Sequence, residues 1–227
     1  MSFVRTVDNS RPAYERRGLA QVEHLVRAHL HTPVARTAPR PAVTVVLLRD
    51  GEPGLEAFLL ECASTMAFAP RQTVFPGGSL DAADAHVRAF ADCEELASWG
   101  KGFGCDLEHA AQLLVAAVRE VFEESGVLLA LDTRTGHPIP GAGLAACRQE
   151  LVTKTRTFAD VLEATGAVLS PALLYPWARW VTPEWSPRRY DTHFLVAALP
   201  TGQWATDGSG EAVSVAWRTS ADGRADS

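Results

Sequence analysis

The chain has 227 residues, of which 47% are hydrophobic and 21% charged, the composition of a soluble globular protein with enough material for one sizeable core. A formal net charge of −6 excludes a sequence-independent grip on nucleic acid phosphates, and no apolar run reaches the length of a membrane span. The four cysteines form no CxxC pair and the N-terminus carries no apolar signal region, so we expect reduced thiols in a cytoplasmic protein. Only Lys101 and Lys154 are lysines, and the other basic residues are arginines, whose planar head can bind phosphate at two points.

The first elements predict an extension followed by a hairpin. Residues 1–40 form an N-terminal extension with one helical stretch at 18–30. The β-branched run AVTVVLLR (42–49) predicts a buried strand, and EAFLLEC (56–62), after the turn DGEPG, predicts its hairpin partner. A short strand TVFP (73–76) then leads into a Gly-Gly turn at Gly77 and Gly78.

The remaining elements mix helices and strands. Residues 79–105 are polar and predict an inserted helical excursion outside the core. Asp106 is the expected N-cap of a long helix that ends at Gly126. Residues 127–131 predict a strand, 141–170 two short helices, and 176–181, 190–199 and 211–218 three further strands. The irregular alternation favours an α/β or α+β fold with a mixed sheet.

The long helix carries a stripe of like charges. Residues three and four apart share a helix face, so Glu120, Glu123 and Glu124 point the same way. They repel one another by a few tenths of a kcal/mol per exposed pair, and they sit near the helix C-terminus, where the dipole disfavours negative charge. A divalent cation would remove this conflict, and carboxylate oxygens suit Mg²⁺ or Mn²⁺. The alternative is a solvated acidic face.

The opposite face of the same helix predicts how it is held. Val115, Val118 and Phe122 fall on that side and are expected to pack against the sheet. Arg119 lies beside Glu120 and four residues before Glu123, where it can orient a carboxylate.

Two segments together resemble the Nudix hydrolase family. REVFEESGV (119–127) matches every fixed position of the second half of the Nudix box, RE-U-x-EE-x-G-U, in which U is aliphatic. In the family the box opens with Gly, five residues and Glu, and seven more residues precede the RE pair. Gly78 fits the opening glycine, but Asp84 stands in place of the Glu, and 34 residues separate Asp84 from Arg119.

Long insertions inside the box are found in a subgroup of the family similar to coenzyme A diphosphatases. VFPGGSLDAAD and ARWVTPEWSPRRYDTHFLVAALP look like that subgroup. The resemblance implies a mixed sheet sandwiched between helices over residues 41–218, with a helical insertion at about 85–111. Residues 219–227 are expected to form a disordered tail.

The resemblance also implies roles for individual residues. Metal ligands would be Glu120, Glu123, Glu124 and the Gly77 carbonyl, joined by Glu211 from a late loop, and the catalytic residues would be Glu120, Glu123 and Arg119. Glu120 is either a ligand or the general base, and Arg119 would hold a glutamate by a bidentate contact. Residues that could bind the anionic substrate are Arg71, Gly78, Arg188 and Arg189. Trp180, Trp185 and Tyr190 either stack on a base or pack in the core, and His193 is expected to be a packed core histidine.

The implied function is metal-dependent hydrolysis of a diphosphate bond in a nucleoside-diphosphate derivative, with Mg²⁺ or Mn²⁺ as cofactor. Coenzyme A, ADP-ribose and dinucleotides all stay open as substrates, and a homodimer is a possible assembly. Two alternatives are a non-catalytic Nudix-fold nucleotide-binding or regulatory module, and an acidic helix in an unrelated α/β domain.

Overall fold

The computed structural model describes residues 37–52, 54–62, 73–184, 186–207 and 212–219, so the helix predicted at 18–30 lies outside them. Its centre is a seven-stranded sheet in the order β3-β2-β1-β8-β7, with β4 added to β1 and β9 to β2. Among the described strands of this sheet, β1 and β8 run parallel and the other pairs are antiparallel. The predicted mixed sheet and α/β class are therefore confirmed.

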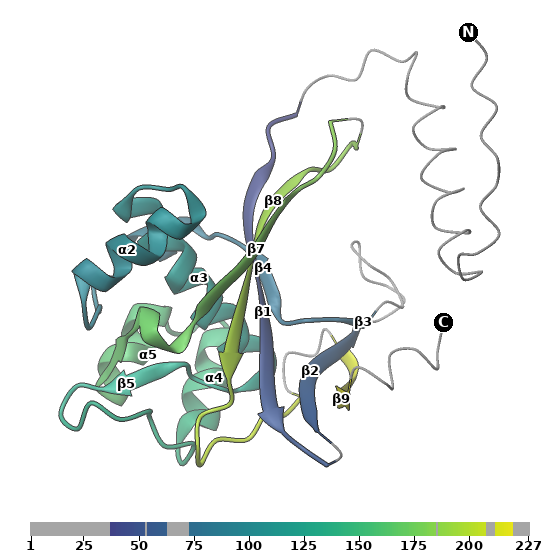
Figure 1. Cartoon of the computed structure of the whole chain (residues 1–227). Coiled ribbons are helices and arrows are strands. Elements are labelled where there is room, and N and C mark those ends of the chain that lie inside the picture. Colours follow the sequence, from purple (N-terminus) through teal and green to yellow (C-terminus); the bar gives the residue numbers. More distant parts are fainter. Residues whose placement is uncertain (1–36, 53, 63–72, 185, 208–211, 220–227) are drawn as a thin grey trace, which may run out of the picture.

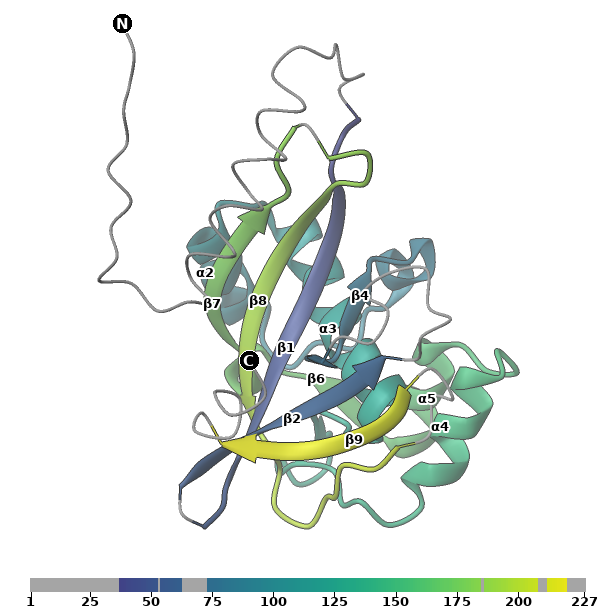
Figure 2. The same cartoon turned by 90° about the vertical axis from the view of Figure 1, so that its right-hand side faces the viewer.

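Helices cover one side of this sheet. Figure 1 shows α2, α3, α4 and α5 together on one side of β1, β8 and β7, while β2 and β9 curve away on the other. The quarter turn in Figure 2 places β2 and β9 in front of α3. In the part of the chain that the structure describes no helix covers the other side, so the second helical layer stays a prediction. None of the described helices is long and apolar enough to cross a membrane.

The predicted strands match the observed ones closely. The observed strands are β1 (Arg40–Asp50), β2 (Leu55–Cys62), β3 (Thr73–Val74), β7 (Tyr175–Val181), β8 (Tyr190–Ala198) and β9 (Ala212–Thr219). β1 and β2 form the expected hairpin. The prediction of a Gly-Gly turn was wrong, because Gly77–Ser79 forms strand β4, whose glycines pair with Val43 and Thr44 of β1.

The excursion at 79–105 is helical, as predicted, but it is not outside the core. It forms the 3₁₀ helix η1 (Ala82–His86) and the helix α2 (Cys93–Phe103). Leu96, Trp99 and Phe103 recur at helical spacing and are buried in the main core, and the Trp99 indole donates to the Leu174 carbonyl at 2.9 Å. The apolar face of α2 is hidden among many polar residues, which is why composition alone misplaced it.

The long helix α3 (Leu107–Ser125) begins and ends where the sequence indicates. The Asp106 carboxylate accepts from the His109 N–H at 2.8 Å, and Gly126 ends the helix with φ of 77°, a conformation that favours glycine. Val115, Val118 and Phe122 are fully buried, so this face packs inward as predicted.

The strand predicted at 127–131 is shorter than expected. The two predicted helices are present as α4 (Leu144–Val152) and α5 (Phe158–Thr165). In the segment directly after α3, strand pairing is confined to β5 (Ala130–Asp132), which pairs with β6 (Ala167–Leu169). The backbone of Leu128 instead bonds to the buried Gln203 amide, which accepts from the Leu128 N–H at 2.8 Å. The same amide donates to the carbonyls of Leu128 and Ile139. A side chain thus replaces a neighbouring strand here.

Gln203→Leu should therefore lower the free energy of unfolding by about 3 kcal/mol, because it leaves three buried backbone groups without partners. Urea denaturation measures this change. Gln149→Leu, on the exposed side of α4, is the control and should stay within about 0.5 kcal/mol of the parent protein. Equal small losses in both variants would contradict this role for Gln203.

Candidate active site

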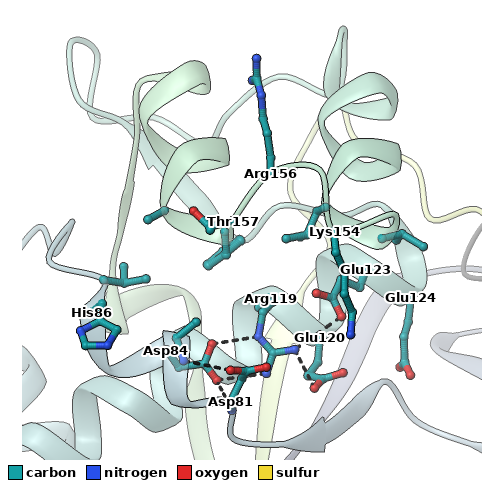
Figure 3. Close-up of a pocket in the computed structure, with 16 residues that line it drawn as sticks. Asp81, Asp84, His86, Arg119, Glu120, Glu123, Glu124, Lys154, Arg156 and Thr157 are labelled. Carbon is teal, nitrogen blue, oxygen red and sulfur yellow. Dashed lines mark hydrogen bonds and ion pairs between the residues drawn. The ribbon is translucent and has the colours of Figure 1, made fainter.

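Three segments meet around one pocket of about 620 Å³. They are the C-terminal half of α3, the segment from β4 into η1, and the loop that joins α4 to α5 (Figure 3). One side of the pocket carries charged residues, namely Asp81, Asp84, Arg119, Glu120, Glu123 and Glu124. The other side includes the apolar residues Leu151, Val152 and Phe158. The pocket thus combines an acidic side with an apolar wall.

Arg119 connects these segments. Its Nε and Nη2 donate to the two carboxylate oxygens of Asp84 at 2.9 and 3.0 Å, and Nη2 also reaches the Ser79 carbonyl. Its Nη1 donates to Glu120 at 2.8 Å and to Glu123 at 3.4 Å. Burial alone would lower the pKa of Arg119, but the hydrogen bond to Asp84 and the surrounding carboxylates raise it above its ordinary value. The guanidinium is therefore fixed as a cation.

The bidentate partner of Arg119 is Asp84, not a glutamate as predicted. Asp84 is 3% exposed and also accepts from the Asp81 N–H at 2.7 Å, which completes a capping box on η1. A buried carboxylate is stable only when paired and hydrogen-bonded, and Asp84 is both. The aspartate at the position of the family's glutamate thus supports the second half of the box.

The two glycines of β4 allow different close contacts. The Gly77 N–H donates to the Glu124 carboxylate at 3.0 Å, and a Cβ on Gly77 would come within 2.8 Å of the Thr44 Cα. A Cβ on Gly78 would come within 2.6 Å of the Glu120 Cδ. Gly77 lets β4 approach β1, and Gly78 makes room for a box carboxylate. The predicted use of the Gly77 carbonyl as a metal ligand stays a prediction.

The electrostatic surroundings of Glu123 disfavour its charged form. Burial raises its pKa from 4.5 to about 7, the Arg119 charge opposes the shift, and the negative charges of Glu120 and Asp84 add to it. Desolvation and like charges both disfavour the carboxylate form. A cation placed beside Glu123 would relieve this conflict.

The donor set fits a hard divalent cation in its chemistry. Within the described ranges no three His, Cys, Asp or Glu side chains are already arranged around one metal position. Glu120 and Glu123 instead share Arg119, while Glu124 is held by Gly77. Glu120, Glu123 and Glu124 nonetheless line one pocket, and carboxylate oxygens are the ligands that Mg²⁺ and Mn²⁺ prefer.

The other predicted site residues lie elsewhere. Arg188 and Arg189 line a separate pocket of about 350 Å³, and Arg189 is engaged with the carbonyls of Thr37 and Thr182. Arg71 and Glu211 lie outside the described residues, as does Trp185.

The remaining aromatic residues and His193 differ in their burial. Trp180 is 65% exposed on β7, so it is not a core residue, and Tyr190 is half-buried. His193 is 1% exposed, packed edge-on against Phe103, and burial lowers its pKa, which confirms the packed core histidine.

Sequence reasoning placed Asp84 in the box by its spacing after Gly78 but did not predict its contact with Arg119. It missed two other contributors to the site. Arg148 of α4 is buried and donates to the Glu123 carbonyl at 2.9 Å, thereby fixing the end of α3. Lys154 lines the pocket from the α4–α5 loop. No local pattern marks the last two, because α4 and the loop reach the site only through tertiary packing.

The fold and this pocket together define a class, the mixed α/β proteins in which a helix with a box of glutamates packs beside a glycine-containing strand. Among solved structures the chain is similar to a NUDIX hydrolase from Alicyclobacillus acidocaldarius, with a TM-score of 0.59 and 27% identity, over 83% of this chain and 82% of that one. The family model described as the NUDT19 Nudix domain matches residues 103–225. The chain belongs to the Nudix family.

Curated relatives agree with this assignment. The chain is 24% identical to the acyl-coenzyme A diphosphatase NUDT19 of Xenopus laevis, over 85% of this chain and 59% of the relative. It is 28% identical to the human protein of the same name, over 64% of this chain and 48% of the relative. The chain thus spans about half the length of these relatives.

Asp84→Asn should lower the free energy of unfolding by about 2–4 kcal/mol, because it removes the charge that balances a buried guanidinium. Binding of Mn²⁺, followed by electron paramagnetic resonance, should weaken as well, since Arg119 would be free to pair more closely with Glu120 and Glu123. Asp92→Asn is the control, because Asp92 caps α2 at an exposed position and asparagine caps equally well. Equal stability of the two variants would rule out a structural role for the Asp84–Arg119 pair.

Glu123→Gln should stabilise the metal-free protein above pH 7. Native Glu123 keeps its proton up to about pH 7 while the unfolded chain loses it near 4.5, so stability contributed by this group falls as pH rises through that window. We expect a gain of about 1–2 kcal/mol at pH 8 and none at pH 4, measured by urea denaturation in EDTA. Glu108→Gln, in the exposed first turn of α3, should change little at either pH. A loss of stability at pH 8 would contradict the burial cost assigned to Glu123.

Proposed function

We propose that this chain is a metal-dependent Nudix hydrolase that cleaves a diphosphate bond in a nucleoside-diphosphate derivative. The observation that carries the proposal is the pocket that all three box glutamates line together with Arg119, which Asp84 holds from 35 residues away. The names of the curated relatives favour a coenzyme A type of substrate over ADP-ribose or a dinucleotide. A homodimer and a cytoplasmic location stay predictions.

Mg²⁺ or Mn²⁺, held by Glu120, Glu123 and Glu124, would neutralise the diphosphate oxygens and make a water nucleophilic at neutral pH. The chain itself supplies orientation and proton transfer. Arg119 holds Glu120 and Glu123 by one nitrogen, so neither carboxylate can turn freely. Glu120 and Glu123 are both candidates for the proton acceptor that such a reaction needs, because both line the pocket and both are oriented by Arg119.

The apolar side of the pocket suits the uncharged part of a substrate. Leu151, Val152 and Phe158 face the same cavity as the carboxylates, so a phosphate could sit on the acidic side while a carbon chain lies along the wall. This division favours a substrate with an apolar moiety close to its diphosphate.

The alternative, a non-catalytic nucleotide-binding module, was suggested by Asp84 and the interrupted box. The observed contacts weaken that reason, because Asp84 still accepts both hydrogen bonds from Arg119. The interruption therefore does not separate the two halves of the box in space.

A panel of coenzyme A, an acyl-coenzyme A, ADP-ribose, NADH and a diadenosine polyphosphate tests the proposal, each with Mg²⁺ and with Mn²⁺. We expect hydrolysis of at least one member, and Glu123→Gln and Glu124→Gln should each reduce kcat about 100-fold or more. Glu108→Gln should keep the parent rate. Binding of a panel member without turnover under any condition would favour the binding module instead.

A further inference from the structure

The loop that joins α4 to α5 is held rigidly over the pocket. The Thr153 hydroxyl donates to the Gln149 carbonyl at 2.8 Å, and the Thr155 hydroxyl to the Glu150 carbonyl at 3.0 Å. Thr157 and Asp160 form a capping box that starts α5. Because its ends are fixed by both helices and its middle by hydroxyl groups, the loop holds the residue between the two threonines in one conformation.

That residue, Lys154, has an unusual backbone. Its φ of 58° is left-handed, and it is the one non-glycine residue with positive φ in the described part of the chain. Elsewhere glycine occupies such positions, as Gly126 and Gly166 do at the ends of α3 and α5. A lysine in this conformation is less stable than a glycine would be. Stability therefore does not explain the lysine.

The Lys154 side chain points into the pocket. Figure 3 shows its ammonium group extending from the loop toward the side that carries Glu123 and Glu120. It lies within 4 Å of no carboxylate among the described residues, so it makes no ion pair there. Arg156, two residues on, instead pairs with Glu150 at 3.2 Å and turns away from the carboxylates.

The charges around the pocket indicate a ligand-binding role for Lys154. Arg119 is fully occupied by Asp84, Glu120, Glu123 and a carbonyl, so it has little left for a ligand. Lys154 is a second cation in the same cavity, and it enters from the α4–α5 loop rather than from α3. A compact ammonium group is a good partner for phosphate oxygens, and it would add to a metal bound by the glutamates rather than replace it.

We propose that Lys154 is a substrate-binding residue, which reaches across the pocket from the α4–α5 loop and contacts the oxygens of a diphosphate bound beside Glu120 and Glu123. The proposal deepens the function proposed above and rests on it for the identity of the ligand. It makes the α4–α5 loop, which lies outside the Nudix box, part of the diphosphate site.

Binding of methylenediphosphonate, a diphosphate that cannot be hydrolysed, tests this role by calorimetry in excess Mg²⁺. Lys154→Gln and Lys154→Gly should each weaken binding about tenfold, and Lys154→Arg should recover most of it. Lys101→Gln is the matched control, because Lys101 is the other lysine of the chain and lies exposed near the end of α2. It should bind like the parent protein.

Two further measurements separate binding from structure. Affinity for Mn²⁺ alone should not fall in the Lys154 variants, since no metal ligand is lost. The Tm of Lys154→Gly should rise by about 2–4 °C, because glycine relieves the left-handed backbone. A Lys154→Gly variant that is more stable but binds the diphosphonate less tightly would show that Lys154 serves ligand binding rather than stability.

The outcomes distinguish this inference from the proposed function. Unchanged diphosphonate affinity in the Lys154 variants, or no diphosphonate binding by the parent protein, overturns the role of Lys154 even if the panel substrates are hydrolysed. A parallel loss of Mn²⁺ and diphosphonate affinity also overturns it, because it would show general damage to the site. Selective loss of diphosphonate affinity, without hydrolysis of any panel member, would uphold Lys154 and reject the enzyme.

Discussion

The site depends on a single guanidinium. Arg119 projects from the C-terminal half of α3 toward Asp84, Glu120, Glu123 and the Ser79 carbonyl, and its side chain is only 11% exposed. A buried charge of this kind is costly to desolvate, and it becomes tolerable only when most of its donors are paired. The same bonds attach β4 and η1 to α3. The contacts that assemble the pocket are therefore the same contacts that neutralise Arg119. Breaking them would leave a buried guanidinium without partners.

This constraint also explains how an interrupted motif can remain one site. The segment between Asp84 and Arg119 contains α2, which buries Leu96, Trp99 and Phe103 against the main core. The insertion begins in η1 and ends in α3, and the hydrogen bonds between Asp84 and Arg119 join these two elements. An aspartate suffices where the family has a longer glutamate, because the capping box on η1 positions the carboxylate beside Arg119. Sequence distance within the box is thus unrelated to distance in space.

Features that depend on neighbouring residues were predictable from the sequence, whereas features that depend on tertiary contacts were not. Asp106 and Gly126 delimit α3 through capping, and the apolar period of Val115, Val118 and Phe122 gives the buried face, so the glutamate stripe could be placed from sequence. The Gly-Gly segment was misassigned as a turn, because pairing with β1 is a tertiary event that the dipeptide does not encode. The strand at 127–131 was shortened by Gln203, which lies about 75 residues away. The bidentate partner of Arg119 was missed for the same reason.

The two sides of the pocket are held in place by different sets of contacts. The acidic side is built from α3, β4 and η1, which are tied together by Arg119 and by the Gly77–Glu124 bond, and a substitution there would disturb both charge balance and packing. The opposite side comes from the α4–α5 loop, whose threonine hydroxyls donate to carbonyls at the end of α4, so its shape is set locally. A segment that is self-supporting in this way can change its exposed side chains without disturbing the carboxylates. Residues such as Lys154 and Val152 are therefore the positions at which binding preference can diverge, whereas Asp84 and Arg119 are fixed by the electrostatics of the core.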